Sequence, residues 1–304
     1  MPVVSKACDQ DGIRLDSFVT GAFDSTYSRS FYKRLIDDGK VSVNGKVITK
    51  AGTKLASGDI VEADIPEPKE DDSFVAQDIP LDIVYEDSDL LVINKPQGMV
   101  VHPAAGHSEG TLVNALLSHC KDELSDINGV VRPGIVHRID KDTSGLMLAC
   151  KNNYTHLKLA DMLSRHEIVR EYRALVYGYV KEDRGMVDAP IGRSANDRRK
   201  MAVIKDGKNA VTHFEVLDRL GEVSDLKLIL ETGRTHQIRV HMAYIGHPVV
   251  GDPVYAPRRK NYGLAGQALH SQAITFVHPR TGETMHFEVD LPDYYEALLR
   301  SFKG

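Results

Sequence analysis

The chain has 304 residues and a formal net charge of −5 at pH 7, with 27% charged and 42% hydrophobic residues, which is the composition of a globular protein. It contains no run of about 18 apolar residues, and its first residues lack the apolar core of a signal peptide, so we expect no membrane span and no secretion. The three cysteines form no CxxC pair. This spacing favours a reducing, cytoplasmic compartment and argues against a zinc knuckle.

The charges are unevenly distributed, although the net charge by itself argues against a nucleic-acid partner. Residues 13–54 contain eight Lys or Arg against four Asp, and residues 193–208 contain six against two. Local basic segments of this kind are where contacts with phosphate form. A solvated surface explains each single segment equally well.

Residues 13–65 predict a small α+β domain. The run SFYKRLIDD is typical of a helix that ends near Gly39, and it places Arg29, Lys33 and Arg34 on one face. VSVNGKVI predicts a hairpin with an Asn-Gly turn, and SGDIVEADI a further strand. The proline-containing, acidic residues 66–78 are then expected to form a linker.

Residues 79–304 predict a second, larger domain. Short strands such as LLVIN, GLMLAC and DLKLILET alternate with loops and a few helices, among them TLVNALLSH with Thr111 near its start. Because regular helical crossovers are missing, we expect an α+β fold with a mixed, largely antiparallel sheet. Neither GxGxxG nor GxxxxGK[ST] occurs, so no nucleotide cofactor is indicated.

The segment GIVHRIDKDTSG places a carboxylate among basic residues between two apolar runs. If IVHRID is a strand, Arg138 and Asp140 lie on the same side of it, at its end. Reactive groups are commonly presented at such positions. An exposed ion pair of little energetic weight is the alternative.

Two further segments carry candidate residues. In EYRALVYG a strand would place Arg170 and Tyr172 on one face, where a tyrosine ring can stack on a base, although such a tyrosine is more commonly part of the core. In ETGRTHQIRVHMAYIGHP we expect a helix from about His236 to Ile245 that Thr235 caps, with Arg239 in its first turns. The histidines in this helix lack the spacing of a zinc site, so we expect no metal.

Together, these segments resemble the RluA/RluD family of pseudouridine synthases. The similarity covers VYEDSDLLVINKPQGMVVHP, TLVNALL, GIVHRIDKDTSGLMLA, EYRALVYG and ETGRTHQIRVHMAYIGHPVVGDPVY, in the order of the family. Residues 13–65 resemble an S4 RNA-binding domain, as in the RluD-like branch that modifies large-subunit ribosomal RNA. One departure is HRID in place of HRLD, a substitution that conserves volume.

The resemblance implies the roles of particular residues. It makes Asp140 the group that attacks C1′ of the target uridine or removes the C2′ proton, alternatives that the sequence leaves open. It makes Arg239, with Arg234 as the weaker candidate, the cation that favours the ionised carboxylate. Tyr172 would stack on the uracil and help to remove the C5 proton. Substrate binding is further expected of Arg138, which would fill the space of the extruded base, and of Arg234, Ile238, Arg29, Lys33 and Arg34.

The reaction implied is an isomerisation in which no atoms enter or leave, so no cofactor is expected. The expected partner is RNA, most specifically 23S ribosomal RNA or the large ribosomal subunit. Two other classes compete with this interpretation. A glycoside hydrolase requires a second carboxylate, for which Glu231 is the candidate in these motifs. A non-enzymatic RNA-binding protein would use the S4-like domain alone.

Overall fold

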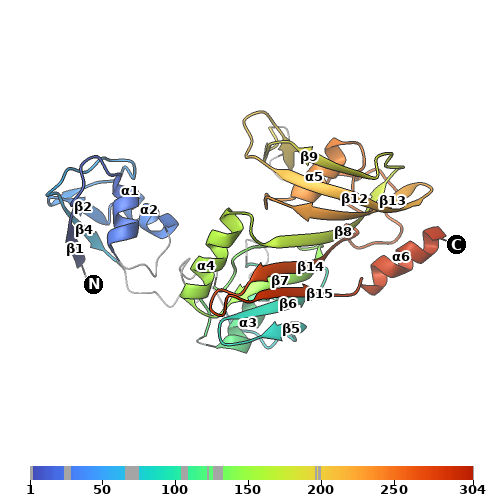
Figure 1. Ribbon diagram of the computed structural model, residues 1–304, viewed down its shortest axis with the longest axis horizontal. Helices are drawn as coiled ribbons and strands as arrows, with labels where there is room; N and C mark the ends of the chain where they lie inside the picture. Colours follow the sequence, from blue (N-terminus) through green and yellow to red (C-terminus); the bar gives the residue numbers. More distant parts are fainter. Residues whose placement is uncertain are drawn as a thin grey trace.

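The computed structural model describes residues 3–23, 29–65, 75–103, 109–121, 123–125, 133–195, 197 and 200–303, without the side chains of residues 29 and 30. Figure 1 shows them as two folded parts, a small N-terminal unit and a larger C-terminal unit. Each has its own hydrophobic core, since the cluster built from residues 8–65 contains no side chain of the larger unit. The predicted linker falls mostly on residues 66–74, which lie outside the described residues.

The N-terminal unit is a four-stranded antiparallel sheet in the order β1-β4-β2-β3, with two helices whose apolar side chains complete its core. The bends between these elements are those that the sequence predicts. Gly39 has φ 71° at the end of α2, and Asn44 and Gly45 have φ 50° and 75° in the β2–β3 hairpin. The elements are β1 Val3–Ala7, α1 Leu15–Ala22, α2 Arg29–Asp37, β2 Val41–Val43, β3 Lys46–Val47 and β4 Ile60–Asp64.

The boundaries of this unit differ from the predicted ones at both ends. Strand β1 pairs with β4 from Val3 to Ala7, so the sheet includes residues that precede the predicted start at residue 13. Val75 and Gln77, which were assigned to the linker, already contact the larger unit. The side-chain amide of Asn114 donates to the backbone carbonyl of Val75, and the backbone N–H of Gln77 donates to the backbone carbonyl of Asn114. Hydrogen bonds between residues far apart in the sequence set both limits, and local composition does not reveal them.

The C-terminal unit is built on a nine-stranded sheet in the order β5-β6-β7-β14-β8-β13-β12-β9, with β15 paired to β14. Among the strand pairs of the described residues, only β7 and β14 are parallel, so the mixed, largely antiparallel sheet is confirmed. A separate hairpin, β10–β11, lies outside this sheet. The strands are β5 Ile83–Glu86, β6 Leu90–Lys95, β7 Ser144–Cys150, β8 Val169–Tyr177, β9 Arg184–Asp188, β10 Ile191–Arg193, β11 Met201–Val203, β12 Val211–Leu220, β13 Val223–Leu230, β14 Leu269–Val277 and β15 Thr284–Glu288.

The helices of the C-terminal unit cover opposite faces of the sheet. Helices α3 (Leu112–Cys120) and α5 (Gln237–Tyr244) share a core with Tyr172 and Ala174 of β8. Helices α4 (Asn153–Ser164) and α6 (Asp293–Lys303) pack in the clusters of the other face. Thr111 caps α3 with its side chain, as its position predicts. The central strand β8 therefore turns alternate side chains toward α5.

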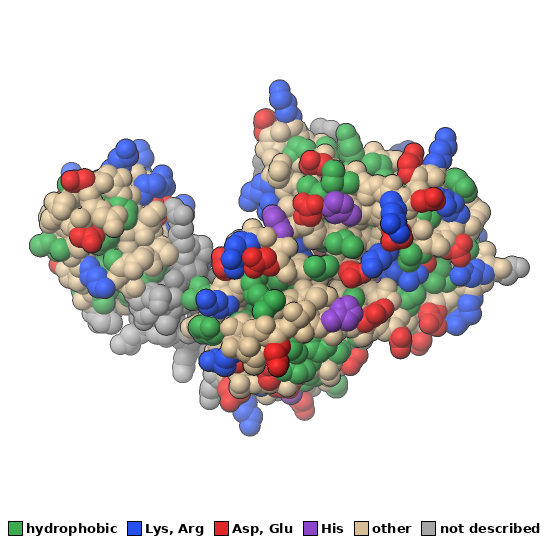
Figure 2. Space-filling model, in the orientation of Figure 1, with side chains coloured by type: hydrophobic (Ala, Val, Ile, Leu, Met, Phe, Trp, Pro, Cys, Tyr) green, Lys and Arg blue, Asp and Glu red, His purple; other side chains and the backbone are tan. Residues whose placement is uncertain are grey.

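The surface mixes charges of both signs. On the face that Figure 2 shows, Lys and Arg side chains lie among Asp and Glu side chains over both units. In the basic segment 193–208, Arg198 and Arg199 lie outside the described residues. No helix of the described residues has the length and apolar character that crossing a membrane requires.

Candidate active site

A cleft of about 620 Å³ opens on the α5 side of the central strand β8. Its walls come from the loop before β7, from β8, from the end of β13 and from the start of α5. Among the described residues that line it, Asp140 is the only carboxylate. Its lining also includes Arg138, Arg170, Tyr172, Arg234, His236, Ile238 and Arg239.

The segment that carries Asp140 is a loop, so the prediction of a strand over IVHRID is wrong. Between residues 133 and 143 only Ile135 makes a β-bridge, with Ala149 of β7. The next backbone N–H of β7, that of Leu148, donates instead to Nε2 of His137 over 3.0 Å. The imidazole thus takes the hydrogen bond that a strand carbonyl would accept. The chain is free to turn away from the sheet and present Asp140 to the cleft.

His137 is neutral in this role. Burial, together with the nearby charge of Arg170, lowers the pKa of its imidazole to about 3. A neutral imidazole has one nitrogen that can accept, and here that nitrogen meets a main-chain donor. His137 is therefore part of the scaffold that shapes the loop.

Lys95, at the end of β6, also holds the loop that carries Asp140. The ammonium of Lys95 is buried and donates to the carbonyls of Pro96, Met99 and Lys141 over 2.8 to 3.0 Å. Burial lowers the pKa of Lys95 to about 8, and the charges of Asp142 and Asp140 act in the opposite direction. Because Lys141 follows Asp140 directly, these contacts fix the position of the carboxylate.

Gly145 follows the loop at a position that only glycine can occupy. Its φ is 107°, and a Cβ atom there would lie 2.2 Å from the carbonyl oxygen of Ser271. This close approach lets β7 begin parallel to β14 directly after the loop.

Arg239 is the cation that the fold brings to Asp140. Its Nη1 donates to Asp140 Oδ2 over 2.8 Å. Its other edge makes two hydrogen bonds with the fully buried carboxylate of Asp252, Nε to Oδ2 over 2.7 Å and Nη2 to Oδ1 over 2.9 Å. Burial alone would lower the pKa of Arg239, but these hydrogen bonds and the two negative charges raise it above its ordinary value. The two hydrogen bonds to Asp252 fix the guanidinium so that an Nη1–H of Arg239 points at Asp140.

Helix α5 begins at Gln237, close to the predicted start, but Thr235 is not its cap. The N-cap is His236, in the left-handed region with φ 58°, and its side chain makes no capping hydrogen bond. The side chain of Gln237 holds the turn before the helix instead, because its oxygen accepts from the Arg234 backbone N–H and from the Thr232 hydroxyl. The unusual backbone turns the His236 ring into the cleft.

His236 faces Asp140 from the second side. Its Nε2 lies 3.8 Å from Asp140 Oδ1, and its Nδ1 lies 2.9 Å from the hydroxyl of Tyr255. Burial lowers the pKa of His236, and the charge of Asp140 opposes the shift. When the Tyr255 hydroxyl donates to Nδ1, the single proton of the neutral ring is on Nε2 and points at the carboxylate.

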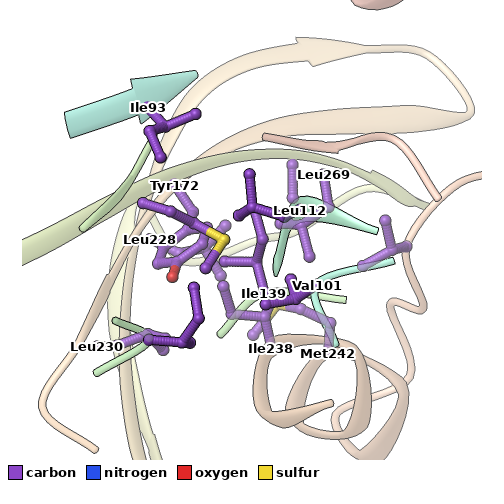
Figure 3. Packing of buried hydrophobic residues seen from close by; sticks show 14 of the residues in the cluster. Ile93, Val101, Leu112, Ile139, Tyr172, Leu228, Leu230, Ile238, Met242 and Leu269 are labelled. Atoms are coloured by element: carbon purple, nitrogen blue, oxygen red, sulfur yellow. The ribbon is translucent and has the colours of Figure 1, made fainter. Parts of the chain in front are cut away.

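Tyr172 forms the apolar side of the cleft with its ring. As the alternation of EYRALVYG predicts, Arg170 and Tyr172 are buried on one face of β8. Figure 3 shows the Tyr172 ring against Leu228, beside a packed floor to which Ile139 and Ile238 contribute. Burial raises the pKa of the Tyr172 hydroxyl, and the charge of Asp140 adds to the rise. The free protein therefore holds this side chain as a phenol.

The remaining expected residues lie at different distances from this centre. Arg138 is exposed at the rim of the cleft, and Arg234 lines the cleft but directs its Nε to the Asn209 carbonyl over 2.8 Å. Lys33 and Arg34 are exposed on α2 of the other unit, where Lys33 pairs with Asp37. The side chain of Arg29 lies outside the described residues.

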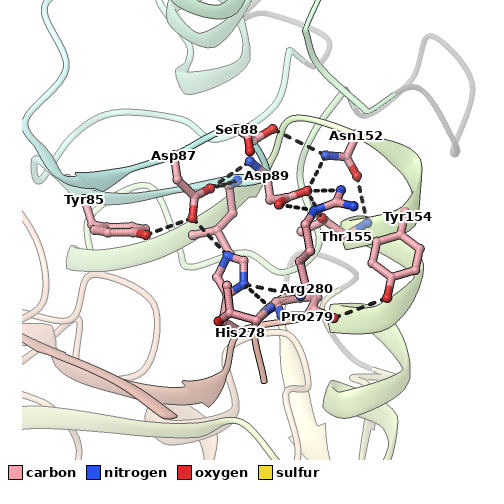
Figure 4. Close-up of polar contacts among 12 residues, drawn as sticks. Tyr85, Asp87, Ser88, Asp89, Asn152, Tyr154, Thr155, His278, Pro279 and Arg280 are labelled. Atoms are coloured by element: carbon pink, nitrogen blue, oxygen red, sulfur yellow. Dashed lines mark hydrogen bonds and ion pairs between the residues drawn. The ribbon is translucent and has the colours of Figure 1, made fainter. Parts of the chain in front are cut away.

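Among the described residues, one group of side chains has the spacing of metal ligands, and it does not line the cleft. Asp87, Asp89 and His278 approach one another within 4.8 Å. Figure 4 shows that hydrogen bonds already occupy them: Asp89 accepts from Arg280 and Asn152, and Asp87 accepts from His278. The cluster ties the β5–β6 turn to the β14–β15 turn and to the start of α4.

Sequence reasoning missed several residues that build the site. Asp252 lies in the segment GDPVY and Lys95 in INKP; both segments carry the family resemblance, but their local patterns indicate no role for these two residues. His236 was considered only as a metal ligand. Glu231, the second carboxylate that a glycoside hydrolase would need, pairs with His213 and does not line the cleft.

The described lining of the cleft combines a single carboxylate, a buried arginine that binds it and a tyrosine ring, which is the arrangement of an enzyme active site. Residues 89–244 match the family described as RNA pseudouridylate synthase, and residues 26–61 match the S4 domain. The chain belongs to the RNA pseudouridylate synthase family and thus to the isomerases. The expectation of this family is confirmed, and the two competing classes are excluded.

Relatives and solved structures agree with this assignment. The chain is 50% identical to the uncharacterized RNA pseudouridine synthase YlyB of Bacillus subtilis over 97% of this chain and 96% of that protein. It is 46% identical to the ribosomal large subunit pseudouridine synthase D of Zymomonas mobilis, over 95% and 93% of the two chains. The structure of human RNA pseudouridylate synthase domain containing 1 shares the fold, with a TM-score of 0.57 at 23% identity over 75% of this chain and 97% of that one.

Proposed function

We propose that this protein isomerises uridine to pseudouridine in large-subunit ribosomal RNA, with Asp140 as the catalytic carboxylate. The observation that carries the proposal is the contact between Asp140 and Arg239 inside the cleft. The full-length similarity to a protein named ribosomal large subunit pseudouridine synthase D supports the choice of substrate. Ribosomal RNA as substrate also favours a cytoplasmic location.

The chemistry requires one carboxylate that remains ionised beside the sugar. The N1–C1′ bond of the target uridine breaks, the uracil rotates, and C5 joins C1′, while the C5 proton is lost and N1 gains one. Asp140 can attack C1′ or remove the C2′ proton, and both routes need the ionised form that Arg239 favours. Among the described residues that line the cleft no second carboxylate offers a general acid.

The neighbouring residues would receive the base. The target nucleotide has to leave its stack before C1′ can reach Asp140. We assign the ring of Tyr172 to stacking on the uracil and its hydroxyl to the removal of the C5 proton. Because the hydroxyl starts as a phenol, it would give its own proton to water as it accepts the C5 proton, and N1 would gain a proton from water, so that the protons balance. Ile238 would pack against the base, and Arg138, at the exposed rim, would fill the place that the base vacates.

The S4 domain would supply affinity rather than chemistry. Helix α2 carries Arg29, Lys33 and Arg34, and the exposed side chains of Lys33 and Arg34 can reach phosphates. Arg234, whose Nε is bound to a backbone carbonyl, would contact the RNA at the edge of the cleft with its remaining donors.

The test is a map of pseudouridine across ribosomal RNA from cells with and without the gene. We expect one or more pseudouridines of the large-subunit RNA to disappear without the gene and to return with a plasmid copy. Purified protein should form the same modification in unmodified RNA. An unchanged map of large-subunit RNA, with losses only in other RNAs, would refute the choice of substrate.

A further inference from the structure

A buried arginine lies in the cleft without a partner among the described residues. Arg170 stands two residues before Tyr172 on the same face of β8, and it lines the cleft. It is only 6% exposed, and its Nε has no hydrogen-bond partner. Within the described part of the chain, no hydrogen bond or ion pair of Arg170 is formed.

The described residues around Arg170 offer it no free negative charge. Gly233 lies so close that a Cβ atom there would be 2.8 Å from Nη1 of the arginine, and the neighbouring imidazole of His137 is neutral. The carboxylate of the cleft, Asp140, is already engaged by Arg239. By contrast, Arg173 on the other face of the same strand is paired with Asp225.

An arginine cannot escape this situation by losing its proton, because its guanidinium stays charged in proteins. A buried charge without a partner destabilises the folded state. A protein can gain from keeping an unpaired buried arginine if a ligand supplies the anion that binds it. RNA carries one phosphate per nucleotide, and the planar guanidinium can bind two phosphate oxygens at once.

We propose that Arg170 is a subsite for a backbone phosphate of the RNA beside the target uridine. The proposal rests on the proposed function, since it takes RNA as the ligand of this cleft. Two residues along a strand span about 6.6 Å, so Arg170 would hold the sugar–phosphate chain while Tyr172, on the same face, receives the base. Arg170 would thus position the substrate and take no part in bond making.

The first experiment compares Arg170→Met with wild type on a short stem-loop from the target RNA. We expect the half-saturating RNA concentration to rise about tenfold or more, while the maximal single-turnover rate changes by less than about threefold. The slope of log affinity against log salt should fall by roughly 0.7 to 0.9, as for one lost phosphate contact. Arg170→Lys should keep that slope, and Arg300→Met, on the exposed surface of α6, should behave as wild type.

RNA with a single uncharged methylphosphonate linkage identifies the phosphate. The linkage is moved one position at a time through the nucleotides that flank the uridine. At one position the neutral linkage should weaken binding to wild type, and Arg170→Met should then add no further loss. Independent, additive losses at every position would overturn the proposal.

Protein stability distinguishes a substrate-binding role of Arg170 from a structural role, because the two roles predict opposite changes on substitution. Because Arg170→Met removes an unpaired buried charge, the melting temperature of the RNA-free protein should stay the same or rise. A fall of more than about 4 °C would assign Arg170 to the scaffold and overturn the proposal. So would a large loss of maximal rate with unchanged RNA affinity, which would indicate that the arginine acts on the uracil.

The outcomes separate this proposal from the proposed function. If wild type forms no pseudouridine in large-subunit RNA, the proposed function fails. If wild type is active and Arg170→Met binds RNA as wild type does, only the phosphate subsite fails.

Discussion

Arg239 links helix α5 to the loop that carries Asp140, through a 2.8 Å hydrogen bond between residues 99 positions apart. The buried carboxylate of Asp252 holds the opposite edge of the same guanidinium. The orientation of the Asp140 carboxylate therefore depends on a guanidinium that Asp252 holds in place. This arrangement separates residues whose loss should stop chemistry from residues whose loss should only weaken binding.

Asp140→Asn should abolish isomerisation and leave RNA affinity within about threefold of wild type. The amide can neither attack C1′ nor remove a proton, and the loss should be on the order of 10³-fold or more. Arg239 keeps its two hydrogen bonds to Asp252, so the variant should fold. Pseudouridine formation and filter binding on the same RNA measure both effects. Residual turnover above about a hundredth of wild type would contradict the assignment.

Arg239→Ala should be nearly inactive and much less stable than Arg234→Ala. Removing Arg239 leaves the buried carboxylate of Asp252 without its ion pair, which typically costs about 3 to 5 kcal/mol. Arg234 touches a backbone carbonyl and should mainly affect binding. Urea unfolding and single-turnover rates test the two variants side by side. Equal rate defects would mean that the wrong arginine has been paired with Asp140.

Tyr172→Phe separates stacking from proton transfer. The ring and its packing against Leu228 remain, so stability and RNA affinity should change little. If the hydroxyl takes part in removing the C5 proton, turnover should fall by about 10² to 10⁴. Release of tritium from C5 of labelled uridine follows this step directly. A variant with near-normal tritium release would limit Tyr172 to stacking.

Deletion of residues 1–66 should weaken binding to ribosomal RNA while the catalytic unit remains folded. The N-terminal unit has a core of its own, and the contacts of Val75 and Gln77 stay in place. Each lost phosphate contact should lower the salt slope by roughly 0.7 to 0.9. At saturating stem-loop RNA we expect a near-normal maximal rate. A collapsed rate in a fragment with normal circular dichroism would show that the S4 domain helps to build the active site.

Asp89→Asn should destabilise the protein at neutral pH by about 2 kcal/mol, because it weakens the hydrogen bonds with Arg280 and Asn152. The Arg280 hydrogen bond holds the pKa of Asp89 below its ordinary value despite burial. A carboxyl whose folded pKa is depressed stabilises the protein above its unfolded pKa, near 4, and loses this effect as the pH falls. The difference in melting temperature between wild type and variant should therefore be largest near pH 7 and shrink toward pH 3. A difference that grows on acidification would contradict the ion pair.

Local patterns predicted those parts of the fold that depend on neighbouring residues. The Asn44–Gly45 turn, the cap by Thr111 and the alternation along β8 each follow from conformational or hydrogen-bonding preferences that act within a few positions. The order and spacing of the motifs were sufficient to identify the family, because long, specific segments rarely recur by chance. The sequence by itself thus determined the fold class and the kind of reaction, and it proposed Asp140 and Tyr172 as candidate site residues.

Contacts between distant segments decided the remainder. The strand predicted through His137 does not form, because the imidazole satisfies the Leu148 N–H in place of a backbone carbonyl. Periodicity cannot reveal such a substitution, since the partner is over ten residues away and is a side chain. Likewise, only the folded chain shows that Asp252 makes two hydrogen bonds to one edge of Arg239, and that Arg170 is buried without an anion among the described residues. The physical reason is that pairing and burial of charges are properties of the assembled interior, where the energy of each charge depends on which other groups the tertiary structure places beside it.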